Sequence, residues 1–332
     1  MKSDPRITSS RGRTYGAQPR RRDGAAAALE IDHVTKRYGD DAAVQDLSFT
    51  VQPGRVTGFL GTNGAGKSTT MKILLDLASA DEGTATIGGT RYRDLEDPAR
   101  TVGVVLEPNA FHPGRSGRDH LRILADGGGF PTERVQEMLT LVGLEDAADR
   151  RVGAYSMGMR QRLSLAAALL GDPPVLVLDE PGNGLDPQGI RDLRGLLRER
   201  AADGDTIFVS SHLLSEVEHL ADEVVVLNKG RLVASGSLRE LQREETFVRS
   251  PSRDHLTEVL GSAGGTVQPF EEDALLVRDL SIDVIGNHAH RAGIELHELS
   301  PHPGSLEDLF MGWTDLTDVD GTLGAAKEVV SA

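Results

Sequence analysis

The chain of 332 residues contains no cysteine and has a single tryptophan. The lack of cysteine excludes disulfides, thiolate zinc sites, iron–sulfur clusters and cysteine nucleophiles. No apolar run approaches the roughly 18 residues that a membrane-spanning helix requires, and residues 1–23 lack the apolar segment of a secretory signal. We therefore expect a soluble, cytoplasmic protein.

Acidic residues outnumber basic residues in the chain as a whole but not at its start. The formal net charge is −15, yet residues 1–23 contain seven Lys or Arg against two acids, so a +5 arm precedes a −20 body. An acidic body disfavours nucleic acid as a partner, because surfaces that bind phosphate backbones are normally basic. We expect residues 1–27 to form a disordered arm, with weak attraction to anionic lipid as the alternative interpretation.

Strand and helix patterns alternate along residues 28–241 and predict one α/β domain with a mainly parallel sheet. The continuous apolar run Pro174–Asp179 is typical of a central parallel strand that is covered on both faces. We predict further strands at Leu29–Val34, Ala43–Val51, Arg55–Leu60, Val102–Leu106, Thr206–Ser210 and Glu223–Leu227, and helices at Gly66–Leu77, within Gly117–Leu144, from Met159, at Ile190–Ala201 and at Leu213–Leu220.

A second pattern follows the charged linker 242–245 and predicts a small domain over residues 246–314. Its order is β-α-β-β-α-β, the ferredoxin-like split motif. The predicted elements are Thr246–Arg249, Ser252–Leu260, Thr266–Phe270, Ala274–Val277, Ser281–Ala292 and Ile294–Leu299, followed by a closing helix, Ser305–Gly312. Residues 315–332 are expected to be a flexible tail.

A glycine-rich loop between a predicted strand and a predicted helix matches G-x-x-x-x-G-K-[ST] completely. Backbone N–H groups of such a loop and the following helix N-terminus bind phosphate oxygens. Lys67 is expected to reach the β- and γ-phosphates, and the Ser68 hydroxyl to bind Mg²⁺. The candidate nucleotide-binding residues are Gly61, Thr62, Asn63, Gly64, Ala65, Gly66, Lys67, Ser68 and Thr69.

Two consecutive carboxylates, Asp179 and Glu180, stand at the end of the predicted apolar strand. Asp179 is placed to hold Mg²⁺, and Glu180 to orient and deprotonate the water that attacks the γ-phosphate. Together with the loop, this pair predicts an enzyme that hydrolyses a nucleoside triphosphate.

Three further segments stand in a fixed order around these motifs. Tyr155-Ser156-Met157-Gly158-Met159-Arg160-Gln161-Arg162 resembles the signature of ABC-type ATPases, Asn183-Gly184-Leu185-Asp186 resembles their D-loop, and His212 occupies the place of their switch histidine. Tyr38 matches the aromatic residue that stacks on adenine. The chain is similar to ABC ATP-binding subunits of the drug-efflux type, which confer daunorubicin or bacitracin resistance.

The resemblance implies a RecA-like core with an antiparallel β subdomain and a helical signature subdomain. It also implies a homodimer that closes on two ATP molecules, in which Ser156 and Gly158 contact the ATP of the partner subunit. By the same likeness, Asp186 lies near the nucleotide, His212 bonds the γ-phosphate and Glu107 contacts Mg²⁺ or its water.

This chain departs from the family pattern at a few positions. Thr62 replaces a proline of the phosphate loop, and Tyr155, Met157 and Met159 replace Leu, Gly and Gln of the signature. Glu107 stands where the Q-loop usually has glutamine. Ser156 and Gly158, the positions that face phosphate, are retained.

The sequence thus predicts the ATPase subunit of an exporter that works with a separate integral-membrane permease, at the inner face of the cell membrane. An importer subunit and a soluble ABC ATPase acting on translation or DNA repair are the alternatives. A neighbouring permease gene without a solute-binding protein favours export. The transported substrate is not encoded in this chain, because the permease selects it.

Four histidines near the C-terminus raise a competing interpretation, a zinc site. His288, His290, His297 and His302 lie within fifteen residues. Their spacing matches no standard zinc pattern, so we expect solvent-facing histidines and no metal there.

Overall fold

The computed structural model describes residues 26–106, 111–241, 244–271 and 273–303. Its strands are β1 Leu29–Tyr38, β2 Asp41–Val51, β3 Arg55–Leu60, β4 Glu82–Ile87, β5 Val102–Val105, β6 Val175–Asp179, β7 Thr206–Ser211, β8 Glu223–Asn228, β9 Arg231–Ser237, β10 Glu244–Arg249, β11 Thr266–Glu271, β12 Ala274–Arg278 and β13 Glu298–Pro303. Its helices are α1 Lys67–Leu74, α2 Pro98–Thr101, α3 Gly117–Gly127, α4 Glu133–Leu141, α5 Met157–Ala168, α6 Pro187–Ala202, α7 Leu214–Glu218, α8 Leu238–Leu241, α9 Arg253–Ser262 and α10 Ile282–Arg291.

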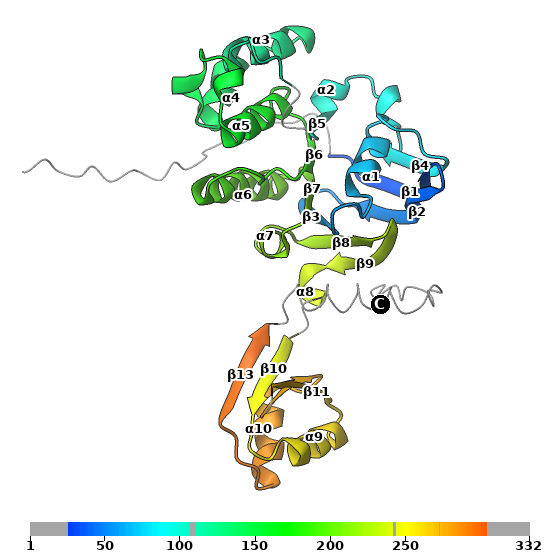
Figure 1. The fold of residues 1–332 in the computed structure, drawn as a ribbon, viewed down its shortest axis with the longest axis vertical. Coiled ribbons are helices and arrows are strands. Elements are labelled where there is room, and N and C mark those ends of the chain that lie inside the picture. The colour runs from blue at the N-terminus through cyan, green and yellow to red at the C-terminus, as the bar shows by residue number, and fades with distance from the viewer. Residues whose placement is uncertain (1–25, 107–110, 242–243, 272, 304–332) are drawn as a thin grey trace, which may run out of the picture. The chain divides into compact units, whose positions relative to one another are not determined.

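A six-stranded sheet in the order β5-β6-β7-β3-β8-β9 forms the main core (Figure 1). The β5–β6, β6–β7 and β3–β8 pairs are parallel, and β9 is an antiparallel edge. Every residue of β6 and β7 is buried, which explains the apolar run of β6 and the apolar centre of β7 at residues 207–209. The backbone N–H of Gly54, just before β3, donates to the carbonyl of Asp205, just before β7. The N-terminal ends of β3 and β7 therefore lie side by side.

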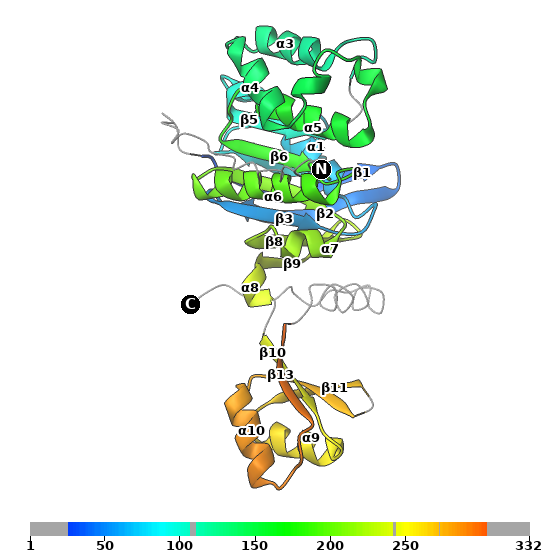
Figure 2. The same ribbon diagram turned by 90° about the vertical axis from the view of Figure 1, so that its left-hand side faces the viewer.

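Helices cover both faces of the strands β5, β6 and β7. The two views place α1 on one face and α6 on the other (Figures 1 and 2). The α6 helix turns Leu193, Leu196 and Leu197 inward, and all three are buried. The apolar stripe of α6 thus supplies one wall of the layered α/β core that the sequence predicts.

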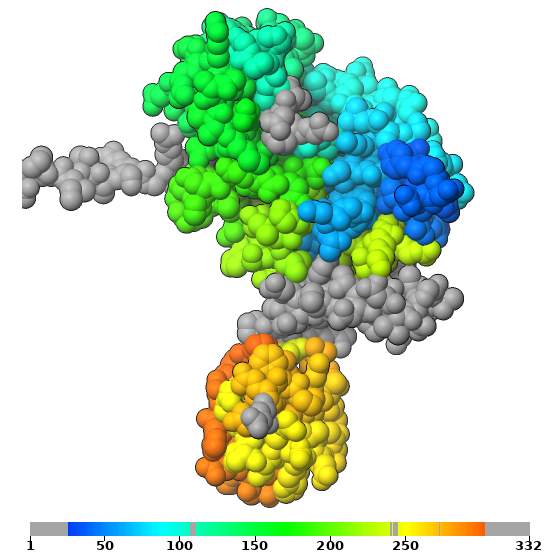
Figure 3. Space-filling view, in the orientation of Figure 1, coloured from blue at the N-terminus to red at the C-terminus, as the bar shows by residue number. Residues whose placement is uncertain are grey.

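A second sheet, in the order β2-β1-β4, is built mostly from the N-terminal part of the described chain. Its strand β2 lies against the β8–β9 hairpin although the sequence separates them by about 180 residues. The N–H of Gln45 donates to the carbonyl of Gly230 at 2.8 Å, and the Arg231 guanidinium donates to the Gln45 side chain at 2.6 Å. The space-filling view shows the corresponding blue and yellow-green surfaces in contact (Figure 3).

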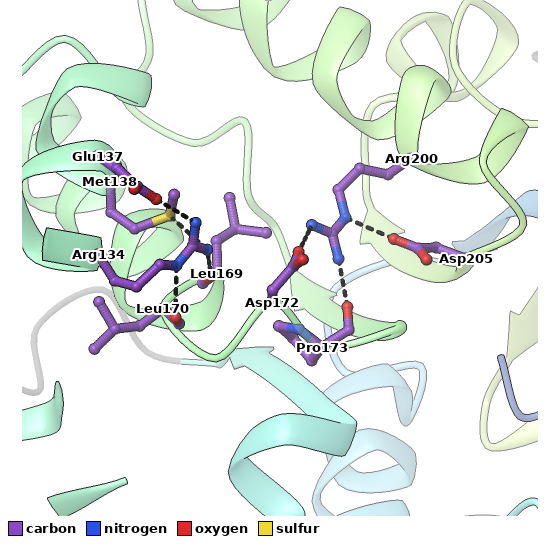
Figure 4. A network of polar contacts seen from close by, with 9 residues as sticks. All are labelled: Arg134, Glu137, Met138, Leu169, Leu170, Asp172, Pro173, Arg200 and Asp205. Atoms are coloured by element: carbon purple, nitrogen blue, oxygen red, sulfur yellow. Dashed lines mark hydrogen bonds and ion pairs between the residues drawn. The ribbon is translucent and has the colours of Figure 1, made fainter. Parts of the chain in front are cut away.

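Two arginines hold the turn that connects α5 to β6 (Figure 4). Arg134 of α4 donates to the carbonyls of Leu169 (3.0 Å) and Leu170 (3.3 Å), just after α5. Arg200 of α6 donates to the carbonyl of Pro173 and pairs with Asp172 at 3.0 Å. The start of the buried strand β6 is therefore fixed from two helices.

The C-terminal part of the described chain contains a four-stranded sheet in the order β11-β12-β10-β13, with all neighbours antiparallel. The element order is the predicted β-α-β-β-α-β. Helices α9 and α10 cover one face, where Val248, Leu260, Val277 and Ile285 form a buried core. The other face carries Phe247, Ala274 and Leu276.

The structure corrects several predicted boundaries. Strands β4 and β9 were not predicted, and β13 begins at Glu298, four residues later than expected, because Ile294 packs into the core from the preceding turn. The closing helix Ser305–Gly312, the tail 315–332 and nearly all of the arm 1–27 lie outside the described residues. None of the helices seen between residues 26 and 303 is long and apolar enough to cross a membrane.

Candidate functional site

The predicted phosphate loop, residues 61–68, connects β3 to α1, and its backbone conformation depends on glycine. Gly64 has φ +84° and Gly66 has φ +106°, backbone angles that residues other than glycine rarely adopt. A Cβ on Gly66 would lie 2.5 Å from the carbonyl oxygen of Ala43, whereas no atom lies within 4 Å of a Cβ on Gly64. The loop is thus packed on one side and open at its tip, as a cradle for phosphate requires.

The ammonium group of Lys67 lies inside this loop. Its side chain is buried, and Nζ donates to the carbonyl oxygens of Gly61 (2.7 Å) and Thr62 (3.4 Å). The residue is also the first of α1, so its ammonium and the helix N-terminus act on the same space. The loop therefore has the charge and the N–H groups to hold a polyphosphate.

A chain of hydrogen bonds links the loop to the ends of β6 and β7. The Ser68 hydroxyl donates to Asp179 Oδ2 at 2.6 Å, and the Ser210 hydroxyl donates to Asp179 Oδ1. The same Ser210 oxygen accepts the N–H of Glu180 at 2.9 Å. Two of the three predicted magnesium ligands, Ser68 and Asp179, are thus in contact, and the predicted base, Glu180, follows Asp179.

The donors at this point suit a magnesium ion. A hydroxyl and a carboxylate are hard oxygen ligands, and Mg²⁺ bound to a nucleotide normally uses one or two such protein groups. Asp179 is paired with Ser210 in the parallel register of β6 and β7, so the residues that follow the two strands lie at the same end of the sheet. Glu180 and His212 follow these strands directly, and His212 is exposed.

Tyr38 ends β1 and presents its ring to solvent. The residue is 54% exposed, and Lys36 Nζ lies 5.4 Å from the ring centroid. A large exposed aromatic side chain is available for stacking on a flat base, as the sequence predicts for this position.

The signature residues occupy the N-terminus of α5. Ser156 is the exposed N-cap, and its hydroxyl accepts the N–H of Met159 at 3.2 Å. The departure at Tyr155 has a structural reason: this buried residue donates its hydroxyl to the carbonyl of Ala147 at 2.7 Å, and burial raises its pKa. Gly158 approaches the predicted D-loop so closely that a Cβ would lie 2.6 Å from the carbonyl of Gly184.

Asp186 has two contacts within its own chain. It caps α6 by accepting the N–H of Gly189 at 3.0 Å and pairs with Arg162 of α5 at 3.0 Å. Both contacts hold the pKa of this carboxyl below its usual value, the cap being the larger cause. Its predicted proximity to nucleotide stays a prediction.

The structure adds two residues that the motifs did not single out, Ser210 and Gln161. Ser210 bridges Asp179 and Glu180, and the buried Gln161 of α5 donates to the carbonyl of Pro181 at 3.0 Å. Gln161 belongs to the signature segment, but strand register reveals the first contact and helix packing the second, so the sequence alone predicts neither contact. Glu107 lies outside the described residues.

The C-terminal histidines are spread over different environments. His288 and His290 lie on α10, and His297 Nε2 lies 3.6 Å from Glu295. The ring of His302 lies beside those of Phe270 and Phe247, with centroids 5.5 Å and 6.4 Å away. Across the described ranges, no group of three or more His, Cys, Asp or Glu side chains is placed to hold a metal ion.

Comparison with known proteins gives the family. Residues 44–183 match the ABC transporter family, and residues 244–307 match a domain of unknown function. The bacitracin transport ATP-binding protein BcrA of Enterococcus faecalis is 40% identical over 291 residues, which cover 85% of this chain and 94% of that protein. The chain belongs to the ABC transporter ATP-binding proteins. The Nod factor export ATP-binding protein I of Burkholderia lata is 41% identical over 66% of this chain and 74% of its own length.

Solved structures agree with this membership and with the predicted fold class. An ATP-binding subunit of an ABC transporter is 30% identical, with a TM-score of 0.60 over 64% of this chain and 91% of its own. A dimeric ATP-binding cassette with bound ADP and Pi, 23% identical, shares the fold with a TM-score of 0.57 over 64% of this chain and 99% of its own.

Proposed function

We propose that this protein is the ATP-hydrolysing subunit of an ABC exporter, with residues 28–241 as its ATPase domain and 246–314 as an accessory domain. The observation that carries the proposal is the hydrogen-bonded series Ser68–Asp179–Ser210–Glu180, which joins the phosphate loop to a carboxylate at the adjacent strand end. Family membership supports ATP as the nucleotide, and names of relatives that include bacitracin transport and Nod factor export support export.

The phosphate loop binds the triphosphate in this proposal. The N–H groups of residues 61–68 and the N-terminus of α1 face the phosphate oxygens, and Lys67 turns its Nζ from the carbonyl oxygens of Gly61 and Thr62 toward the β- and γ-phosphates. Ser68 and Asp179 would hold Mg²⁺, which neutralises charge that develops on the phosphoryl oxygens. Tyr38 stacks on adenine.

Glu180 supplies the base. Its carboxylate accepts a proton from water as the water oxygen bonds to the γ-phosphorus and the bond from that phosphorus to the β–γ bridging oxygen breaks, which releases ADP and phosphate. His212, just past β7, donates a hydrogen bond to the γ-phosphate and helps to keep the water in line.

Two copies of the chain would act together with an integral-membrane permease at the inner face of the cell membrane. Ser156 is exposed at the start of α5, and Gly158 follows within its first turn. A helix N-terminus attracts anions, so this end of α5 is suited to the γ-phosphate of ATP bound by the partner subunit. The cargo, an antibiotic-like compound in this proposal, is selected by the permease.

Glu180→Gln tests the proposal. We expect this variant to bind ATP but to lose at least a hundredfold in turnover, and to accumulate as a dimer with ATP in size-exclusion chromatography. Glu133→Gln, at an exposed position on α4, is the matched control and should hydrolyse ATP normally. Normal turnover by the Glu180 variant would show that another group acts as the base.

A further inference from the structure

The backbone of Glu180 has an unusual conformation that its surroundings must maintain. Its φ is +50°, in the left-handed region that costs a non-glycine residue about 1 kcal/mol or more. On the N-terminal side, its N–H donates to Ser210 Oγ at 2.9 Å. On the C-terminal side, its carbonyl accepts the N–H of Asn183 at 3.2 Å. The direction of the carboxylate thus depends on contacts around the peptide, in addition to those of the side chain.

Gln161 adds contacts from a different element. It lies on α5, is 2% exposed, and donates its amide Nε2 to the carbonyl oxygen of Pro181 at 3.0 Å and to that of Glu180 at 3.4 Å. Two carbonyl oxygens at this end of the amide identify it as the nitrogen end, because only the NH₂ group can donate to both. Burying a side-chain amide costs free energy unless its polar atoms form hydrogen bonds. Among the described residues Gln161 Oε1 has no hydrogen-bond partner, so only the Nε2 end of the amide is bonded. The two N–H···O contacts therefore offset the burial of this side chain.

The start of α5 lies directly against the loop of residues 180–186. Gly158 has no room for a Cβ against the carbonyl of Gly184, and Arg162 pairs with Asp186 at 3.0 Å. Gln161 holds the first residues of this loop, and Arg162 holds its last. Contacts at both ends leave the loop little freedom to move independently of the helix.

We infer that Gln161 is a positioning residue for Glu180: through the carbonyls of residues 180 and 181 it holds the backbone that aims the base at water. The inference rests on the proposed function, because it assumes that Glu180 is the base. It assigns to the helix that begins with Ser156 a second task, the orientation of the base in its own chain.

Two variants of the full-length chain and one control variant test this role. Gln161→Met keeps the length of the side chain and removes both N–H donors, so we expect kcat for ATP to fall at least tenfold, which is about 1.4 kcal/mol. The Kd of a fluorescent ATP analogue should change less than threefold, since the amide of Gln161 bonds to the carbonyls of residues 180 and 181. Gln136→Met, on the exposed face of α4, is the control and should leave kcat unchanged.

Gln161→Glu provides a readout that a purely structural role would not give. A neutral carboxylic acid can donate one hydrogen bond to these carbonyls, whereas a carboxylate cannot. Burial next to carbonyl oxygens favours the neutral form. We therefore expect the ratio of kcat for Gln161→Glu to that of the unmodified protein to rise as pH falls from 8 to 6, and the same ratio for Gln161→Met to stay flat.

The outcomes separate this inference from the proposed function. If the unmodified protein hydrolyses ATP and Glu180→Gln does not, but Gln161→Met keeps kcat within twofold, the positioning role is wrong and the proposed function stands. A flat ratio for Gln161→Glu with nucleotide binding intact also overturns the role. If the unmodified protein does not hydrolyse ATP, or if Glu180→Gln hydrolyses it normally, the proposed function fails first.

Discussion

Replacing Arg200 with methionine should destabilise the ATP-binding core more than most single substitutions. The Arg200 side chain is 4% exposed, and its Nε lies 2.7 Å from Asp205 Oδ2, whose side chain is 1% exposed. Its guanidinium also pairs with Asp172 and donates to the carbonyl of Pro173 (Figure 4). Methionine fills similar space but leaves the Asp205 carboxylate buried without its positive partner.

The magnitude follows from removing the guanidinium that pairs with this buried carboxylate. Breaking a buried ion pair by removing one partner costs about 3–5 kcal/mol, which is a large part of the roughly 5–15 kcal/mol that stabilises a domain. For a domain of this size, each kcal/mol lowers Tm by about 2–4 °C. We therefore expect Arg200→Met to lower Tm by roughly 6–20 °C.

Thermal unfolding followed by circular dichroism measures this effect, with Arg198→Met as the matched control. Arg198 is exposed on the same helix, so its substitution should change stability by no more than about 0.5 kcal/mol. In Arg200→Met/Asp205→Leu, removal of the buried carboxylate should recover part of the lost Tm. A Tm within 3 °C of the unmodified protein for Arg200→Met alone would refute the reasoning, because Asp205 would then not need this charge.

Two further predictions concern the nucleotide and pH. Tyr38→Ala should raise the KM for ATP at least fivefold, because base–aromatic stacking is worth about 1–3 kcal/mol, whereas Tyr38→Phe keeps the ring and should leave KM nearly unchanged; equal KM values for the two variants would contradict stacking. Burial, and to a lesser extent the charge of Arg115, lower the pKa of the half-buried His120, so the fold favours its neutral form. Its contribution to stability is therefore present above the unfolded pKa of about 6.5 and is lost as pH falls below it; urea midpoints at pH 7.5 and 5.5 should differ less in His120→Gln than in the unmodified protein.

Apolar continuity made the central strands predictable. β3, β6, β7 and β8 appear within about one residue of their predicted bounds, because strands buried on both faces have mostly apolar central residues. β9 escaped prediction for the opposite reason: as an antiparallel edge it has no fully buried residue and no apolar run. β4 is similar, with small and polar residues and three exposed positions at its start.

The sequence predicts those parts of the site that are formed by consecutive residues. The conformation of the loop of residues 61–68 depends on its own glycines, so it can be predicted from consecutive residues of the sequence. The bridge from Asp179 through Ser210 to Glu180 depends on the register of two strands about 30 residues apart, and the bond from Gln161 depends on how α5 packs. Neither arrangement follows from spacing in the sequence.

The contacts of α5 at its two ends bear on how the signature and the base move. At its C-terminal end, Arg134 binds the carbonyls of Leu169 and Leu170, in the turn that leads into β6. Near its N-terminus, Gln161 binds the carbonyls that follow β6. The turn between α5 and β6 is thus held by Arg134 of α4, and Gln161 of α5 contacts the residues that follow β6, so we expect α5 and β6 to move together. In the proposed function, ATP of the partner subunit that binds at the start of α5 would then also act on the backbone of Glu180, so closure of the proposed dimer and orientation of the proposed base would be coupled.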